Sequence, residues 1–423
     1  MPTTRAAARR LPDVWHSGVL QAISHHTDEP TLLRMTMLSA SVRREMLEPS
    51  FKLHTGLCWS VRLDFAKERD DDDVPRGCVG EGRRRRALAL PFMQYAGEVC
   101  ERMIIFDSTE TEVMAICKLC PRLKKLCVSN ARRVGMPTWP SPRVRAIARV
   151  CPLLEQVELM GLPLQQVLPH FGNLRVVKFG PDADNGQLTK PAEAAVCRFL
   201  KRQRATEPGI ALEFTETAVC PSAALISAVG DAPITKVSIF ESGVDLESTR
   251  HMLAACTSLK TLVLYGFGRF AQPAPAVELV RLVTACPSIT ALSLCESGVD
   301  DDGALLEGLT RLTELQTLKL HGRLYLSRAG AEVLHTRAHF PRLAELQADF
   351  GAEPGWVDTA ETLQRIVDAR PALRILTVSE RCFPADADVL EYELPFEATL
   401  RARGGAFRFD DPESWDPDND EDC

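Results

Sequence analysis

One short apolar phrase, repeated at a nearly fixed spacing, constrains the fold of this chain more than any other feature. The pattern Leu-x-x-Leu-x-Leu, with other apolar residues sometimes replacing leucine, recurs through most of the sequence. Its clearest copies begin at Leu259, Ile289, Leu315, Leu343 and Leu373, with steps of 30, 26, 28 and 30 residues. A period in the high twenties is typical of a solenoid, in which each repeat contacts only its neighbours.

The earlier part of the chain carries the same phrase less regularly. Copies begin at Leu123, Leu154 and Leu174, and APITKVSIF is a degenerate copy before Leu259. The stretch GIALEFT and the segment 97–107 are further candidates. We therefore expect the solenoid to occupy residues 91–400.

Each repeat combines a strand pattern with a helix pattern. Alternating apolar residues in the phrase predict a short strand with one buried face. The segment before each phrase is amphipathic, as in AVELVRLVTACPSI, where Leu279, Leu282, Val283 and Cys286 recur at helical spacing. A proline then ends the helix. These patterns predict an α/β solenoid with a parallel sheet along one side.

A cysteine often precedes that proline, and it could serve redox chemistry, metal binding or packing. Other repeats place Phe171, Phe340 or Arg370 at the same position, which favours packing. Cys117 and Cys120 have zinc-like spacing but no second matching pair, so packing is again the favoured interpretation. We expect no metal and no cofactor, and we expect these helix-end thiols to be buried: Cys120, Cys151, Cys256 and Cys286.

The phrase that follows one of the strands, GVDDDGALLEGL, resembles the cysteine-containing class of leucine-rich repeats. The family opens each helix with an Ile-Thr-Asp-x-Gly-Leu phrase, which is approximated here by Val299, Asp300, Asp301, Gly303 and Leu305. The resemblance is good over residues 256–378 and looser over 97–240. It implies a horseshoe-shaped solenoid of parallel strands and helices.

Residues 11–65 carry no repeat and predict a small all-helical module that resembles the F-box. The matching residues are Leu11 and Pro12 in the entry, Val19, Leu20 and Ile23 in the first helix, and Leu32 and Leu38 in the second. Val14, Ala40 and Val42 depart from the family pattern. The resemblance implies docking on the Skp-type adaptor of a cullin-RING ubiquitin ligase. The alternative is that these helices only cap the solenoid.

Three remaining segments are predicted to lie outside the folded modules. Residues 1–10 are expected to be disordered, 66–90 to be a charged linker, and 401–423 to be an acidic tail. Within the linker, Arg83–Arg86 could be a nuclear localisation signal or bind a polyanion. A solvated linker, balanced by Asp70–Asp73, is the favoured interpretation.

The composition narrows the functional classes. The chain has 423 residues, 45% of them apolar and 25% charged, as in an ordinary globular protein. It has no apolar run long enough to span a membrane and no secretory signal, so we expect its 14 cysteines to stay reduced in the cytoplasm or nucleus. A net charge of −7 does not favour nucleic acid. No nucleotide-binding, metalloprotease or hydrolase motif is present, so we expect a non-catalytic protein.

The repeat also predicts where a target protein would bind. The residue between the last two leucine-like positions, and the one after them, face the open side of the sheet. The first set is Glu158, Lys178, Ser238, Val263, Ser293, Lys319, Gln347 and Thr377, and the second includes Phe240, Tyr265 and His321. Phe240 and Tyr265 lie one repeat apart and should be side by side, with Phe267 close behind.

Two functions are therefore open from the sequence. In the first, the chain is the substrate-recognition subunit of a cullin-RING ligase, with the F-box-like end on the adaptor and the repeats on a target. In the second, it is a leucine-rich-repeat scaffold without a ligase role. For the aromatic residues, the alternative to target binding is that one or two rings fold over the edge of the solenoid.

Overall fold

The structure is a computed structural model, and it describes the following ranges: 60–64, 100–106, 110–129, 141–159, 164–179, 189–203, 209–214, 221–240, 245–267, 274–350, 359–379 and 395–410. The chain divides into two compact units, Met1–Gly161 and Leu162–Cys423. The F-box-like residues from Leu11 to Leu38 and the arginine run Arg83–Arg86 lie outside the described residues.

The first unit contains four described strands that pair in parallel and in chain order. They are β1 (Ser60–Asp64), β2 (Arg102–Phe106), β3 (Lys125–Ser129) and β4 (Gln156–Leu159). Helix α7 (Glu110–Cys117) connects β2 to β3, and α8 (Ser141–Val150) connects β3 to β4. Strand β2 confirms that the segment 97–107 is a repeat.

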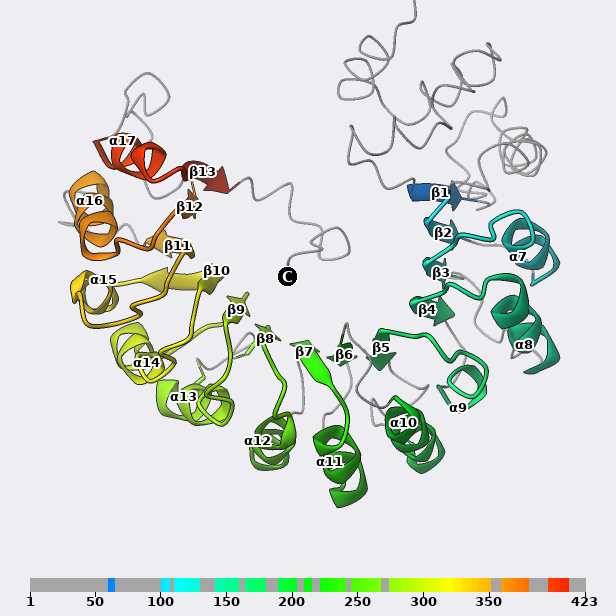
Figure 1. Ribbon diagram of the computed structural model, residues 1–423. Helices are drawn as coiled ribbons and strands as arrows, with labels where there is room; N and C mark the ends of the chain where they lie inside the picture. Colours follow the sequence, from blue (N-terminus) through cyan, green and yellow to red (C-terminus); the bar gives the residue numbers. More distant parts are fainter. Residues whose placement is uncertain are drawn as a thin grey trace, which may run out of the picture. The chain divides into compact units, whose positions relative to one another are not determined.

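The second unit continues the same alternation, with each strand parallel to the next. Its strands are β5 (Val176–Phe179), β6 (Ile210–Phe214), β7 (Ile234–Phe240), β8 (Thr261–Tyr265), β9 (Ala291–Cys295), β10 (Thr317–Leu326), β11 (Glu345–Phe350), β12 (Ile375–Ser379) and β13 (Ala406–Asp410). Its helices are α9 (Leu164–Val167), α10 (Lys190–Arg202), α11 (Ala223–Gly230), α12 (Leu246–Ala255), α13 (Ala276–Val283), α14 (Asp302–Leu309), α15 (Arg328–His335), α16 (Thr359–Ala369) and α17 (Pro395–Ala402). Within this unit the strands lie on one side and the helices on the other (Figure 1). The predicted α/β repeat architecture, that of a leucine-rich-repeat solenoid, is confirmed for the described residues.

The core of each repeat consists of the leucine-like positions that defined the pattern. Leu259, Ile289, Leu315, Leu343 and Leu373 are all fully buried. So are the later leucine-like residues of the same phrases, and so is the inner face of the helices. Burying one such side chain stabilises the fold by roughly 2 kcal/mol, so the ladder of leucines supplies most of the cohesion between repeats.

The strands extend beyond the predicted limits of the solenoid at both ends. Strand β1 falls in the range expected to be an all-helical module, and β13 falls in the range expected to be an acidic tail. In β13 the rings of Phe407 and Phe409 contact each other, and Phe407 also contacts Phe396 of α17. The alternating pattern Ala-Phe-Arg-Phe-Asp is typical of a strand, but the acidic residues that follow Asp410 led us to predict a tail for the whole segment.

Three consecutive aspartates hold the starts of three helices. Asp301 accepts a hydrogen bond from the backbone N–H of Ala304 at 2.8 Å and so caps its own helix, α14. Asp300 accepts one from the N–H of Ala276, 2.8 Å away, at the start of α13. Asp302 accepts from the N–H and the hydroxyl of Ser327, the residue that caps α15. The phrase that carried the family resemblance thus connects neighbouring repeats.

At the helix-end position before the proline, some residues donate a hydrogen bond as well as filling space. Cys286 donates from its thiol to the carbonyl of Leu253 in the preceding repeat, with sulfur and oxygen 2.8 Å apart. Cys151 likewise donates to the carbonyl of Cys117 at 3.3 Å. These carbonyls lie at helix ends, where intrahelical partners run out. The position therefore admits a donor as well as apolar bulk, since Phe171 and Phe340 also fill it and are buried.

Arg370 fills the same position with a buried guanidinium, and only 2% of its surface is exposed. It donates to the carbonyls of Leu334 at 2.7 Å and Val333 at 3.3 Å, in the last turn of α15, and also to the carbonyl of His339. The negative end of the helix dipole favours a cation there. Burial lowers the pKa of Arg370 to about 10, so the group stays charged at neutral pH.

Replacing Arg370 should test this donor role. We expect Arg370→Met, which keeps apolar volume, to lower the free energy of unfolding by roughly 3 kcal/mol, because several buried helix-end carbonyls lose their donor. Urea unfolding monitored by circular dichroism measures the change. The control is Arg365→Met, because the side chain of Arg365 is 62% exposed and its pairing with Glu361 is a surface contact. Equal stability of the two variants would show that bulk alone matters.

Candidate protein-binding surface

The open face of the sheet in the second unit carries one residue per strand in a continuous row. We call this the middle row: Lys178, Glu213, Ser238, Val263, Ser293, Lys319, Gln347, Thr377 and Arg408. Each member is the register partner of the next, so the predicted alignment is confirmed within this unit. Glu213 and Arg408 were not predicted, because their repeats lack a clear consensus. Glu158 has the equivalent place in the first unit, where it is the register partner of Cys127.

The middle row is nearly covered on the central strands. Ser238, Val263, Ser293 and Lys319 retain only 3%, 4%, 5% and 8% of their surface. The ammonium of Lys319 also lies 3.9 Å from the carboxylate of Glu345. These residues face the open side but expose little area, and the role of Lys319 as a contact residue stays a prediction.

Accessible side chains lie instead at the carboxyl ends of β7 and β8. Phe240 and Tyr265 are register partners, and their ring centroids are 5.5 Å apart with the planes tilted by 39°. Both residues are half-buried, so neither ring belongs to the leucine core. Phe267 follows Tyr265 after Gly266, whose φ of 80° turns the chain, and it is also partly exposed. The side-by-side arrangement of the two rings is confirmed.

A fourth aromatic residue reaches this edge through a bulge that the sequence analysis missed. The register between β10 and β11 shifts between Leu320 and Tyr325, so that Tyr325 is the partner of Asp349. Tyr325 is 49% exposed. We define the aromatic edge as Phe240, Tyr265, Phe267 and Tyr325. The alternation Leu-Tyr-Leu that follows Gly322 in the sequence could have predicted this continuation of the strand.

His321 takes the register position opposite Cys295, at the start of this bulge. Cys295 is 1% exposed and lies between the strands that carry Tyr265 and Tyr325. The structure describes only the backbone of His321, so its role as a contact residue stays a prediction.

The helix-end cysteines are buried, and the pKa of two of their thiols is raised. Cys120, Cys151, Cys256 and Cys286 are buried as predicted. Burial raises the pKa of Cys256, and burial raises that of Cys286 to about 12, so their thiolates are scarce at neutral pH. Across the ranges that the structure describes, no group of three or more His, Cys, Asp or Glu side chains could hold a metal ion.

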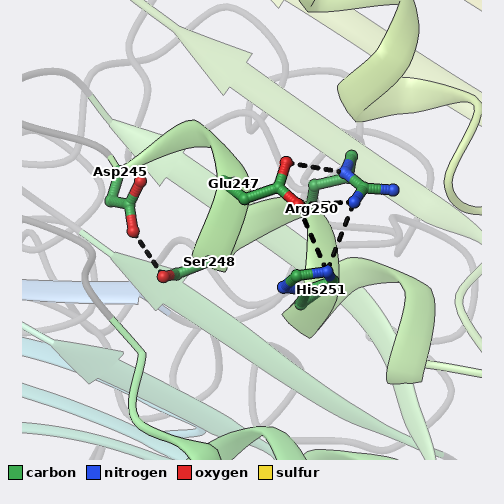
Figure 2. A network of polar contacts seen from close by, with 5 residues as sticks. All are labelled: Asp245, Glu247, Ser248, Arg250 and His251. Atoms are coloured by element: carbon green, nitrogen blue, oxygen red, sulfur yellow. Dashed lines mark hydrogen bonds and ion pairs between the residues drawn. The ribbon is translucent and has the colours of Figure 1, made fainter.

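A polar network on and just before α12 joins several titratable side chains (Figure 2). Glu247 pairs with Arg250 at 2.6 Å and with His251 at 3.3 Å, and Ser248 donates to Asp245. The hydrogen bond from Arg250 lowers the pKa of Glu247, and the one from Ser248 lowers that of Asp245. These side chains are solvent-exposed, and the two hydrogen bonds stabilise the ionised form of the carboxylates. The network supports a surface helix and holds no poised general base.

Comparisons with known proteins add little to this description. No family model matches the chain, and no curated protein matches it. Among solved structures, the leucine-rich repeat-containing protein LegL7 from Legionella pneumophila is similar at 10% identity and a TM-score of 0.37, covering 81% of this chain and 97% of that one. The complex of Rad7 and Elc1 from yeast is similar at 12% identity and a TM-score of 0.34, covering 70% and 76%. At these TM-scores, the assignment of the fold rests on the strand order and register given above.

The structure also bears on membrane association. None of the helices in the described ranges is long and apolar enough to cross a membrane.

Thiol labelling tests the packing role of the cysteines. We expect Cys120, Cys151, Cys256 and Cys286 to react slowly with an aromatic disulfide reagent in the native protein and rapidly after unfolding. Cys127 and Cys197 are partly exposed and provide an internal comparison. Mass spectrometry after timed labelling assigns each rate. Equal rates for both groups, or stoichiometric zinc in the purified protein, would contradict the packing interpretation.

Proposed function

We propose that this chain is a non-catalytic protein-binding subunit whose repeats hold a target protein against the aromatic edge. The observation that carries the proposal is the half-buried pair of Phe240 and Tyr265 at the ends of β7 and β8. Aromatic side chains dominate the energetics of protein interfaces. A pair fixed on a rigid sheet loses little conformational freedom when a partner binds, which favours affinity.

We further propose that the N-terminal segment connects this target to a ubiquitin ligase. The support is the F-box-like pattern of Leu11, Pro12, Val19, Leu20 and Ile23, followed by Leu32 and Leu38. In such a complex the chain would raise the effective concentration of the ubiquitin-loaded enzyme near a target lysine, so it would need no catalytic residue of its own. A Skp-type adaptor and a cullin would be the partners, in the cytoplasm or nucleus.

Target capture should depend on the aromatic edge. We expect Phe240→Ala combined with Tyr265→Ala to weaken capture by roughly 2 kcal/mol or more, with little change in melting temperature, because the rings lie outside the core. Quantitative affinity purification, normalised to folded protein, compares this variant with Glu247→Ala combined with Arg250→Ala on the exposed surface of α12. A large drop in melting temperature with unchanged capture would assign the rings to the core.

Adaptor binding should depend on the N-terminal pattern. We expect Leu11→Ala combined with Pro12→Ala to abolish co-purification of the Skp-type adaptor and cullin while leaving the far-ultraviolet circular dichroism unchanged. The replacement Arg9→Ala with Arg10→Ala, directly before the pattern, is the matched control. If the wild-type chain retains no adaptor in mild salt, the ligase role is wrong and the scaffold function remains.

A further inference from the structure

Lys236 on β7 and Lys260, which directly precedes β8, differ from two lysines of the middle row. Lys178 pairs with Glu213 at 3.5 Å, and Lys319 lies 3.9 Å from Glu345, so these charges are balanced. Lys236 is partly exposed and Lys260 is exposed, and within the part of the chain that the structure describes neither side chain has an ion pair. Among the described residues, these two ammonium groups therefore have no carboxylate partner.

The two lysines and the rings of Phe240 and Tyr265 lie at opposite ends of the same two strands. Lys236 and Phe240 are both on β7, face the same side, and are four residues apart, which is about 13 Å at the usual strand rise. Lys260 directly precedes Thr261, the register partner of Lys236. A ligand that contacts both ends must therefore run along the strands.

Two middle-row residues, Ser238 and Val263, lie between the two ends. Both are almost fully covered, so a ligand that spans the two ends takes its contacts from the lysines and the rings. The two middle-row residues present no large side chain that would have to move, whereas the lysines and the rings on either side are accessible. The positive end attracts carboxylates, and the aromatic end offers apolar contact.

We propose that β7, β8 and the end of β10 bind an extended acidic segment of a partner protein. Its carboxylates contact Lys236 and Lys260, and an apolar side chain about four residues away packs on the aromatic edge. This inference rests on the proposed function and specifies the target class. An acidic peptide is favoured over nucleic acid, because a phosphate backbone requires a longer basic stripe than this unit provides and the chain carries a net charge of −7.

Selection from a library of short random peptides against the full chain tests the proposal. We expect enriched peptides to combine Asp or Glu with an aromatic residue or leucine about four positions away. Fluorescence anisotropy with an enriched peptide should show binding that weakens about tenfold or more in Lys236→Glu with Lys260→Glu and that weakens with added salt. Arg145→Glu with Arg149→Glu on the exposed surface of α8 should leave binding unchanged.

Several outcomes would overturn the inference. One is a failure to enrich acidic peptides, and another is equal binding by the charge-reversed variant and the wild type. A third is tighter binding of a single-stranded oligonucleotide that depends on Lys236 and Lys260. Carbodiimide, which joins carboxylates to amines, identifies the occupant in the full chain. If carbodiimide links these lysines to residues 411–423 of the same chain, or to a second copy of the chain, then that segment or copy occupies the surface and the proposed partner segment is wrong.

The failure of this inference can be separated from failure of the proposed function. If Phe240→Ala with Tyr265→Ala lowers target capture but charge reversal at Lys236 and Lys260 does not, the function stands and the acidic specificity is wrong. If both changes leave capture intact, the binding surface itself is wrong.

Discussion

The packing of leucine-like side chains between neighbouring repeats is the interaction on which the rest of the structure depends. A single strand and helix cannot bury their own apolar faces, so each repeat needs the next to cover it. Register follows from this requirement, because a shift of one residue would turn every leucine toward solvent. The continuous middle row is a consequence, since the residue between two core positions must face the open side in every repeat.

Hydrogen bonds at the helix ends tie the repeats together more specifically than the apolar core does. The aspartates from Asp300 to Asp302 accept hydrogen bonds at the starts of three successive helices. Cys286 and Arg370 each donate to carbonyls at the end of the helix in the preceding repeat. Helix ends leave backbone groups without partners, and burial makes their loss costly. At this helix-end position Cys286 and Arg370 donate to such carbonyls, whereas Phe171 and Phe340 fill the same position with buried apolar rings.

The sequence predicted the strand and helix alternation because leucine spacing reflects burial directly. It also placed Phe240 beside Tyr265, since residues one repeat apart become register partners. It did not reveal how far Lys319 is covered, because exposure depends on neighbours contributed by other strands. The sequence also did not predict the bulge that brings Tyr325 to the same edge. A register shift depends on the local fit between two strands and has no fixed residue spacing in the sequence.

The alternation along each strand separates stability from recognition. On β7 and β8, the side chains that point inward belong to the leucine core, whereas those that point outward range from the nearly covered Ser238 and Val263 to the half-buried Phe240 and Tyr265. The inward residues fix the backbone, and the backbone then sets the spacing between the lysines and the rings. A partner therefore meets side chains whose positions are determined before binding, which lowers the entropic cost of association. It follows that chemistry specific to this protein must lie in the outward residues, since the inward ones are shared by every repeat that stacks in the same way.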